Sequence, residues 1–581
     1  MKRHPLALMI TLAMLQGGCS YKDAMPQHQS NTPSPEYPTS LKEDALISQE
    51  ADIMATNQAP MPQRANLKKE KLAQSQEARV AAKMAVGAAM SPPMVYGMMD
   101  TQAMPREERD KFEHFKDNVV KQVATDPVST FSLDVDTASY ALVRQSIQQG
   151  RLPAADAVRT EELINYFNYP YPKANNEHPF AVDTEISTAP WQPDHYLLRI
   201  GVQAQESHIS AMPPANLVFL VDVSGSMNDA NKLPLVISSL QMLTQQLRPQ
   251  DKVSLVVYAG RTEVVLEPSN NKADILAALG RLQAGGSTAG TSALALAYKM
   301  ARKGYIKDGI NRILMATDGD FNVGVTDTNQ IKDMVKRERE TGVTLSTLGF
   351  GQGNFNDAMM EQIADVGNGN YSYIDSLNEA RKVLVDELSS TFNTVAKDVK
   401  VQIEFNPDQV SEYRLIGYEN RQLNREDFNN DKVDAGDVGA GKSVTAIYEI
   451  TPKTAQASVD ALRYQKEQTK TKPISKELAF LKIRYKKPNA DKSILWTQPL
   501  VMPKTVISFN NASESQRFAT AVAGFGQLLR QSSNMGQLSY AQVAQIAQQA
   551  KGFDNTGAKA EFIQLVKNAQ ALAGKVEPNV E

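Results

Sequence analysis

Residues 216–226 read NLVFLVDVSGS, an apolar run that ends in Asp222 and is followed by the hydroxyls of Ser224 and Ser226. The run from Leu217 to Val221 has the length and the uninterrupted apolar character of a strand that is buried on both faces. One carboxylate and two hydroxyls at the end of such a strand are hard oxygen ligands, which bind divalent cations without His or Cys. The segment therefore predicts a buried strand that carries a candidate metal site.

Two further segments predict that this strand belongs to an α/β domain with a ligand site at one sheet edge. Residues 313–320 read ILMATDGD, a second apolar run that ends in a carboxylate, Asp318, and residues 286–291 read GSTAGT before a helical stretch. From Asn216 to Thr394 strand and helix patterns alternate, which indicates a doubly wound, mostly parallel sheet. In such sheets, ligands bind where the carboxyl ends of neighbouring central strands meet. We expect the three segments to meet there.

Together the three segments resemble the metal-ion-dependent adhesion site of von Willebrand factor type A domains. The resemblance implies five site residues, three as direct metal ligands and two as carboxylates acting through water or hydrogen bonds: Ser224, Ser226 and Thr288, and Asp222 and Asp318. Thr288 lies six residues before Leu294, the spacing usual in that family, and Ser287 and Thr291 remain alternatives. The implied cofactor is Mg²⁺, with Mn²⁺ or Ca²⁺ as alternatives.

The composition of the candidate site favours binding over catalysis. Neutral hydroxyls with only two carboxylates leave a divalent cation under-neutralised, so an open coordination position attracts an anionic oxygen from outside. In the type A family that oxygen comes from an Asp or Glu of a protein partner. A hydrolytic metal site more often contains His or a denser carboxylate cluster, and the six histidines all lie outside the three segments. We therefore expect a binding protein and no catalytic residues.

Two alternative functions remain open. Residues 436–443 read GDVGAGKS, which fits the phosphate-loop pattern and would make the chain a nucleotide hydrolase. A phosphate loop follows an apolar strand and opens a helix, whereas this segment follows a polar run and precedes the alternating segment from Val444 to Ile450. A Gly-rich hairpin connection is the favoured interpretation. In the second alternative, the chain is a non-catalytic structural organiser of the envelope, and the metal acts only as a structural staple that holds the loops together.

The amino terminus predicts export and a lipid anchor. A basic start, Met1-Lys2-Arg3, precedes an apolar stretch from Pro5 to Leu15, which is too short to span a bilayer. The following Gly17-Gly18-Cys19 resembles a bacterial lipoprotein signal, although Gln16 stands where Leu is usual. The resemblance implies removal of residues 1–18, acylation of Cys19 with groups such as palmitate, and, because Ser20 follows, the outer membrane facing the periplasm. Cys19 is the single cysteine, so an intramolecular disulfide is excluded.

A chain of 581 residues is too long for a single core, and a net charge of −3 gives no reason to expect nucleic acid. We predict six parts: a signal peptide (1–18), a disordered tether (19–118), an N-terminal domain (119–190), a type A domain (214–394), a β-rich module (395–508) and a helical C-terminal region (509–581). Strand patterns at 181–186 and 197–202 fit the β-rich module, which would make the type A domain an insertion in it. Asp136 and Thr137 are expected to cap a helix.

The order of these parts resembles a family of bacterial type A domain lipoproteins, the YfbK-like family. The residues that carry the resemblance include the segment 316–324, which reads ATDGDFNVG, and the flanking regions from about Asp126 onward. The resemblance implies an architecture more than a biological role.

Overall fold

The computed structural model describes residues 110–133, 136–175, 177–286, 290–319, 328–353, 355–460, 476–488 and 490–574. The expected signal peptide, Cys19, most of the expected tether and Thr288 lie outside these ranges. Within them, no helix has both the length and the apolar character needed to cross a membrane.

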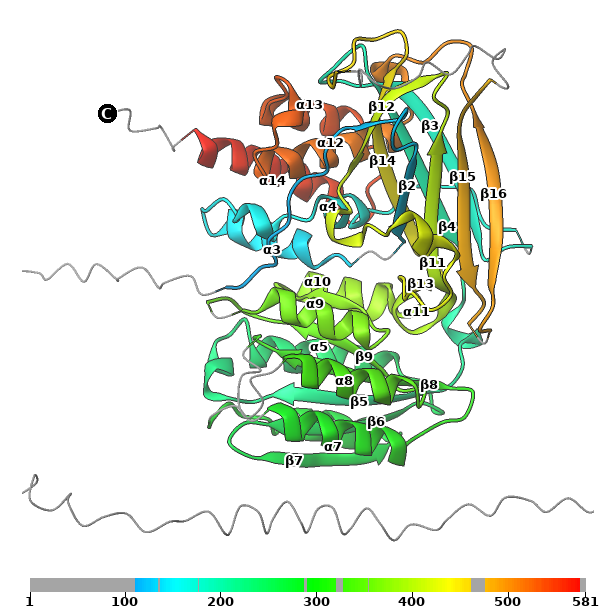
Figure 1. The fold of residues 1–581 in the computed structure, drawn as a ribbon. Coiled ribbons are helices and arrows are strands. Elements are labelled where there is room, and N and C mark those ends of the chain that lie inside the picture. Colours follow the sequence, from blue (N-terminus) through cyan, green and yellow to red (C-terminus); the bar gives the residue numbers. More distant parts are fainter. Residues whose placement is uncertain are drawn as a thin grey trace, which may run out of the picture. The chain divides into compact units, whose positions relative to one another are not determined.

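A six-stranded sheet forms the centre of the type A domain, and the expected doubly wound, mostly parallel architecture is confirmed (Figure 1). The strand order is β10-β9-β8-β5-β6-β7, and all neighbours are parallel except β6 and β7. The strands are β5 (Ala215–Asp222), β6 (Lys252–Tyr258), β7 (Thr262–Ser269), β8 (Ile310–Thr317), β9 (Thr344–Gly349) and β10 (Tyr371–Tyr373). The two apolar runs of the sequence, β5 and β8, are central neighbours as expected.

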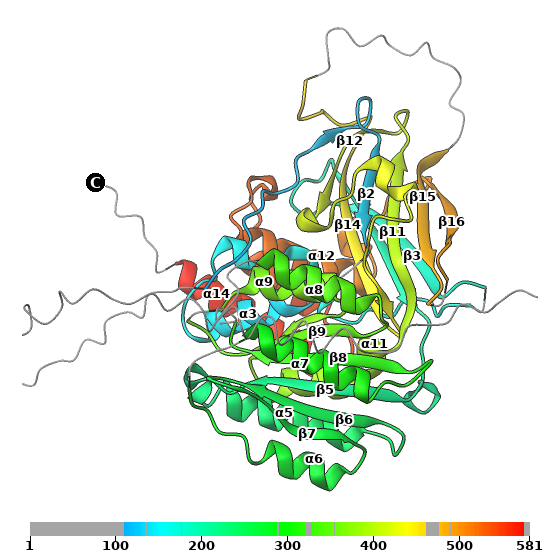
Figure 2. The ribbon, with the colours of Figure 1, turned by 60° about the horizontal axis from the view of Figure 1, so that its bottom comes forward.

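Helices cover both faces of this sheet, as Figure 2 shows from a second side. Leu217, Phe219 and Val221 of β5 pack on one face with α5 (Leu233–Gln246), α6 (Lys272–Leu279), α10 (Leu377–Arg381), the π-helix η4 (Lys382–Asp386) and α11 (Leu388–Phe392). Val218 and Leu220 pack on the opposite face with α7 (Gly290–Lys303), α8 (Thr328–Arg339) and α9 (Asp357–Val366). Burial on both faces explains why β5 is an uninterrupted apolar run.

Two antiparallel sheets form the β-rich module, with a shared apolar core between them. The first has the order β1-β12-β14-β4-β3: β1 (Lys121–Gln122), β12 (Val410–Ile416), β14 (Ser443–Pro452), β4 (Tyr196–Ala204) and β3 (Phe180–Thr188). The second has the order β13-β11-β15-β16, with β2 also paired to β11: β13 (Val438–Gly439), β11 (Thr394–Phe405), β15 (Glu477–Lys486), β16 (Ser493–Val501) and β2 (Val128–Ser132). Since β3 and β4 precede the type A domain and pair with later strands, that domain is an insertion, as expected.

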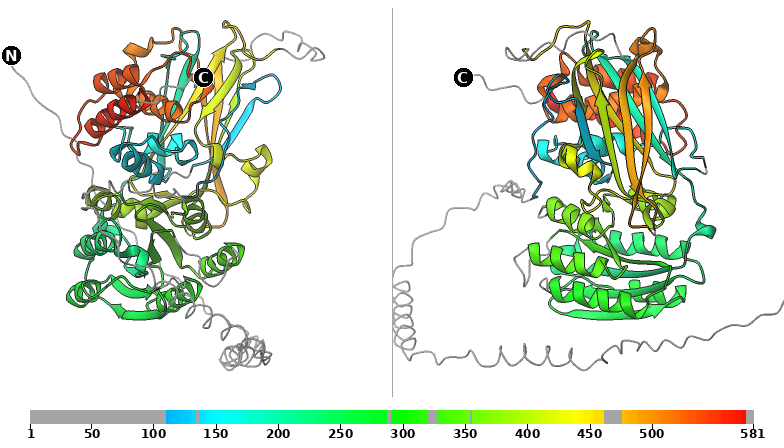
Figure 3. Two further views of the ribbon diagram at one scale, coloured as in Figure 1. Left: turned by 90° about the vertical axis from the view of Figure 1, so that its left-hand side faces the viewer. Right: turned by 45° about the vertical axis from the view of Figure 1, so that its right-hand side comes forward.

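Helices from both ends of the described chain pack against the outer side of the first sheet (Figure 3). They are α3 (Ala138–Gln148), α4 (Thr160–Asn165), α12 (Glu514–Leu529), α13 (Tyr540–Gln549) and α14 (Ala558–Ala573). Phe167, Phe518 and Phe562 meet edge to face in their core. The short 3₁₀ helices are η1 (Ala155–Ala157), η2 (Ile209–Ala211), η3 (Gly225–Asn228), η5 (Glu419–Arg421), η6 (Arg425–Asn429), η7 (Phe509–Asn511) and η8 (Ser533–Met535).

The start of α3 differs from the expected helix cap. Thr137 makes no side-chain capping bond, and the backbone N–H of Ser139 donates instead to Oε2 of Glu162 at 2.8 Å. Asp136 Oδ1 accepts a hydrogen bond from the backbone N–H of Tyr371 on β10, at 2.9 Å. The helix begins directly after Thr137, as predicted, but the expected side-chain cap is wrong, because Glu162, a partner that a local pattern does not reveal, accepts the bond from Ser139.

Residues 110–118, which the sequence places in the tether, make contacts with the domains that follow. Asp110 Oδ1 accepts hydrogen bonds from the backbone N–H groups of Gly353 and Phe355, at 2.9 and 2.8 Å. Asn118 is buried and donates to the carbonyls of Leu415 and Gly417. These contacts are single polar side chains in a segment without apolar periodicity, so the sequence pattern does not predict them.

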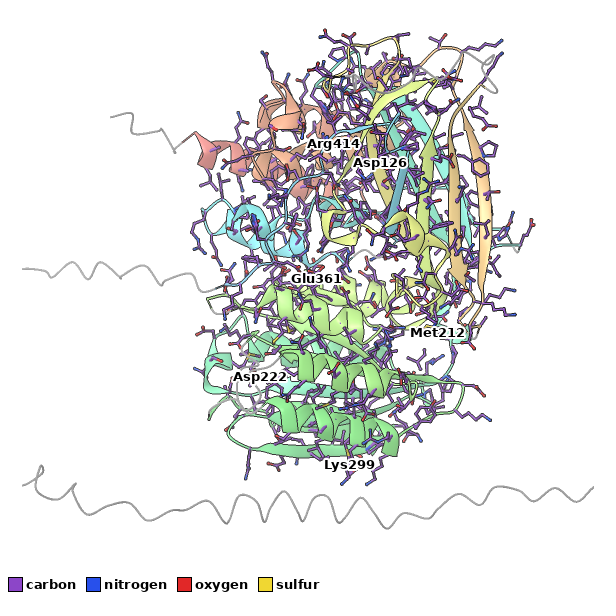
Figure 4. All side chains as sticks on the ribbon, in the orientation of Figure 1. Asp126, Met212, Asp222, Lys299, Glu361 and Arg414 are labelled. Carbon is purple, nitrogen blue, oxygen red and sulfur yellow. The ribbon has the colours of Figure 1, made fainter. Side chains whose placement is uncertain are left out.

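A buried ion-pair network joins the type A domain to its neighbours. Arg159, at the start of α4, forms a short ion pair with Glu162, and its Nη1 lies 2.6 Å from Asp357 Oδ2 at the start of α9. Arg421 forms an ion pair at 3.0 Å with Glu361, which also lies on α9 and is labelled in Figure 4. The side chain of Arg159 is 2% exposed and that of Asp357 is 0% exposed. Helix α9 is therefore anchored by charges that are mostly buried.

Candidate metal centre

The candidate metal centre lies where the parallel strands β5 and β8 end. Asp222 is the last residue of β5, and Asp318 follows directly after β8; the register pairs Val221 with Ala316. Figure 4 labels Asp222. Both carboxylates are buried, with exposed fractions of 0% and 2%. The structure thus brings the two predicted carboxylates to the same edge of the sheet, at a position where ligands bind in open α/β folds.

Asp222 is held by two hydrogen bonds. Its Oδ1 accepts from the backbone N–H of Ser224 at 2.8 Å, and its Oδ2 accepts from the hydroxyl of Thr317 at 3.1 Å. Burial raises the pKa of Asp222 to about 6, the bonds from Ser224 and Thr317 act in the opposite direction, and the nearby charge of Asp318 adds to the rise. A cation near this carboxylate would favour its charged form.

The hydroxyls of Ser224 and Ser226 lie together beside this carboxylate. Their Oγ atoms are 3.0 Å apart; Ser224 is buried and Ser226 is exposed, so the pair reaches from the interior to the surface. The backbone N–H of Gly225 donates to Gly286 O at 2.9 Å, and the N–H of Gly285 donates to Val223 O at 2.7 Å. The first loop is therefore tied to the start of the second loop.

The second loop itself is only partly described. Gly286 is placed, whereas Thr288 and its alternative Ser287 lie outside the described residues, as does the side chain of Thr291. The ligand role of Thr288 therefore stays a prediction.

Lys232 is a feature of the site that the sequence pattern did not reveal. Its Nζ lies 2.8 Å from Asp318 Oδ2, and the two side chains are 9% and 2% exposed. The Lys232 stem passes over Gly351, where an added Cβ would lie 2.4 Å from Lys232 Cε. Gly351 also has φ +72°, so two independent constraints favour glycine there. A lysine just before a helix ordinarily faces solvent, which is why its position gave no signal.

The donor set fits a hard divalent cation. Carboxylates and hydroxyls are the oxygen ligands that Mg²⁺, Mn²⁺ and Ca²⁺ bind in proteins. Among the residues that the structure describes, no group of three or more His, Cys, Asp or Glu side chains could hold a metal. The candidate site is thus built on serine hydroxyls with two carboxylates.

A groove of about 690 Å³ opens beside the loops of the site. Val223, Gly285 and Gly286 from the two loops form one part of its lining. Val264, Val265 and Leu282 give it an apolar part. Its charged part consists of the exposed side chains of Arg261 and Arg281 and of Glu263, which pairs with Arg261. The surface next to the candidate metal centre can therefore contact an extended segment that is both apolar and acidic.

The phosphate-loop-like segment has the geometry of a strand connection. Val438 and Gly439 form β13, which pairs with β11, and Ser443 begins the strand β14. The Nζ of Lys442 lies 3.9 Å from Glu387 Oε2. Because a strand follows the segment, no helix amino terminus lies there to receive a phosphate. The expected strand connection is confirmed, but the expected hairpin is wrong, because β13 pairs with β11 in one sheet and β14 pairs with β12 and β4 in the other.

Comparison with known families places this fold in a class. Residues 216–387 match the von Willebrand factor type A domain, residues 106–199 match a family described as von Willebrand factor, and residues 390–572 match a family described as uncharacterized protein YfbK, C-terminal. The chain is therefore a type A domain protein. Domains of this class generally mediate protein–protein interaction, and such proteins are typically non-enzymatic.

Individual relatives narrow the class to a family. The chain is 51% identical over 473 residues to the uncharacterized protein YfbK of Escherichia coli, covering 80% of this chain and 81% of that protein. It is 34% identical over 185 residues to the uncharacterized protein sll0103 of Synechocystis, covering 32% of this chain and 43% of that protein. This chain belongs to the YfbK-like family of type A domain proteins. A solved von Willebrand factor type A protein from Catenulispora acidiphila is similar at 15% identity with a TM-score of 0.37, covering 66% of this chain and 89% of that one.

Proposed function

We propose that this chain is an envelope-anchored protein that binds a protein partner through a divalent cation at the type A domain. The cation, Mg²⁺ or alternatively Mn²⁺ or Ca²⁺, is held by Asp222, Ser224, Ser226, Thr288 and Asp318. One observation carries the proposal: the two buried carboxylates and the paired serine hydroxyls converge at the ends of β5 and β8.

The chemistry of binding follows from this donor set. Asp222 is fixed by the backbone of Ser224 and by Thr317, so it can orient the hydroxyls without moving. A bound cation supplies a coordination position for an anionic oxygen, and serine hydroxyls leave its charge incompletely neutralised. A carboxylate from an Asp or Glu of the partner completes the coordination. The proposed role is binding and not catalysis, because a hydrolytic metal site more often contains His or a denser carboxylate cluster.

The groove beside the site supports an acidic partner segment. Arg261 is exposed and forms a 3.0 Å pair with Glu263, while Arg281 is exposed on the same lining. Basic side chains next to a cation attract an acidic segment and mainly raise its association rate. The apolar lining at Val264 and Val265 offers contact area to the residues that flank the partner carboxylate.

The anchoring part of the proposal rests on Cys19. Two or more acyl chains on this residue would give stable membrane association, with the domains facing the periplasm at the outer membrane. Substitution Cys19→Ser should move the protein from the membrane fraction to the soluble fraction and leave its melting temperature unchanged. Retention of the serine variant in washed membranes at high salt would contradict a lipid anchor.

Crosslinking in intact envelopes tests partner binding. A crosslinked species should form with the native chain, disappear after chelation, return with Mg²⁺ and be absent from Ser226→Ala. Ser238→Ala is the matched control, because Ser238 is a half-buried helix serine outside the site whose hydroxyl donates to Pro234 O. If crosslinking persists in chelator while the melting temperature falls strongly, the metal is a structural staple and the adhesion proposal is wrong.

A further inference from the structure

A buried ammonium ion occupies the acidic end of the candidate metal centre. The Nζ of Lys232 lies 2.8 Å from Oδ2 of Asp318, and both side chains are almost inaccessible to water. Asp222, the second carboxylate, is fully buried nearby. One of the two negative charges that would attract a divalent cation is therefore already paired with a positive charge of the chain itself.

The position of Lys232 is fixed by its surroundings. Its backbone N–H donates to Asp229 O at 2.9 Å, and its carbonyl accepts from the backbone N–H of Val236 at 2.9 Å in the first turn of α5. The close approach of its stem to Gly351 limits sideways movement. The two bonds fix the backbone of Lys232, and the contact with Gly351 confines its stem.

We infer that Lys232 is a resident counter-cation that sets the affinity of this site for its divalent metal. It neutralises Asp318 in the metal-free protein and repels a cation that enters beside the same carboxylate. The inference rests on the metal site proposed above and adds its regulation: loading with metal depends on the ambient cation concentration. The extent of partner binding then depends on the concentration of the divalent cation.

The electrostatics give the direction of the effect. Coulomb energies between charges a few Å apart at a partly buried site reach several times the thermal energy, even with an effective dielectric constant of about 20. Removing the ammonium charge should therefore tighten metal binding by at least about tenfold. It should also leave Asp318 without its counter-charge in chelator, so that the metal-free form melts at a lower temperature than the native protein.

The test is a Mn²⁺ titration of the full chain, followed by electron paramagnetic resonance of the free ion, with melting curves in chelator and in Mn²⁺. Lys232→Met removes the charge and keeps the stem, and Lys232→Gln also keeps a donor for Asp318, which protects against misfolding. Lys232→Arg keeps the charge. Lys299→Met is the matched control, since Lys299 is an exposed lysine on α7 of the same domain (Figure 4).

We expect the Met and Gln variants to bind Mn²⁺ at least about tenfold more tightly than the native chain. Their melting temperatures should also rise more than that of the native chain when Mn²⁺ is added. The Arg variant and the Lys299 control should stay within about twofold of the native affinity. Equal or weaker binding in both uncharged variants would overturn the role of Lys232 while leaving the metal site intact. No binding by any variant at millimolar Mn²⁺ would overturn the metal site itself and this inference with it.

Discussion

The hydroxyl of Thr317 donates a hydrogen bond to Oδ2 of Asp222 at 3.1 Å, and so joins the last residues of two neighbouring parallel strands. The same hydroxyl oxygen accepts from the backbone N–H of Gly319 at 3.2 Å. Asp318 lies between Thr317 and Gly319 in the chain. A single buried threonine thus fixes the relative position of both carboxylates of the candidate metal centre.

Substitution Thr317→Val keeps the shape of this side chain and removes both hydrogen bonds. We expect the free energy of unfolding in chelator to fall by about 1–2 kcal/mol, because a buried carboxylate loses a donor. Mn²⁺ binding should weaken as well, since Asp222 is no longer held. Urea unfolding and Mn²⁺ titration measure the two effects, and Thr497→Val on the exposed side of β16 is the control. A variant with native values in both measurements would contradict this positioning role.

The buried network at α9 predicts a large stability effect. Arg159→Met should lower the free energy of unfolding by about 3–5 kcal/mol, because Glu162 and Asp357 lose their buried counter-charge. Arg302→Met is the control, since its pair with Glu338 is half exposed and should contribute little. Urea unfolding followed by tryptophan fluorescence measures both. If the two variants lost similar amounts of unfolding free energy, burial would not be the reason why the network stabilises the protein.

Glu161 predicts a pH dependence of stability. Burial, with a smaller contribution from the charge of Glu419, raises the pKa of Glu161 from 4.5 to about 7. Between these values the folded protein binds more protons than the unfolded chain, so stability falls as pH rises from about 4.5 to about 7. In Glu161→Gln the amide oxygen can still accept the 2.9 Å bond from the backbone N–H of Tyr418. Because the amide does not ionise, the loss of stability that comes from Glu161 should be absent in this variant.

The measurement is the free energy of unfolding of native and Glu161→Gln protein from pH 5 to pH 8. The variant should gain on the order of 1–3 kcal/mol relative to the native chain across this range. Glu340→Gln, an exposed position after α8, should leave the native pH profile unchanged. Parallel profiles for the native chain and Glu161→Gln would show that Glu161 is ionised in the folded protein at pH 5.

The phosphate-loop-like segment predicts no nucleotide binding. Lys442→Ala should leave the amount of bound ATP unchanged, because the segment connects two strands and its lysine faces Glu387. The change should alter the free energy of unfolding by less than about 1 kcal/mol, since the side chain is partly exposed. Equilibrium dialysis with labelled ATP measures binding. Saturable binding that this substitution abolishes would support the hydrolase alternative.

The sequence predicted the elements whose chemistry is local. The apolar runs 217–221 and 313–317 are β5 and β8, and each ends in its carboxylate at the expected edge of the sheet. The insertion of the type A domain was also predictable, because the alternating segments around 181–186 and 197–202 have the period of strands with one buried face. These features are encoded by residues that are close together in the chain.

The features that were missed depend on partners that are distant in the chain. Lys232 lies 86 residues from Asp318, and Arg159 lies 198 residues from Asp357. No periodicity marks a charged residue whose partner is that far away, and charged residues are ordinarily exposed. The wrong prediction of a cap at Asp136 has the same cause, because its partner, the backbone N–H of Tyr371, lies 235 residues further on.

A Mn²⁺ titration of Asp222→Asn tests whether Asp222 belongs to a divalent metal site. The amide keeps an acceptor for the backbone N–H of Ser224 and removes the charge. Asp229→Asn is the matched control, since Asp229 is an exposed carboxylate in the same loop. We expect Asp222→Asn to lose at least about tenfold in Mn²⁺ affinity, whereas Asp229→Asn should keep the native value. Native affinity in Asp222→Asn, or an equal loss in both variants, would contradict this expectation.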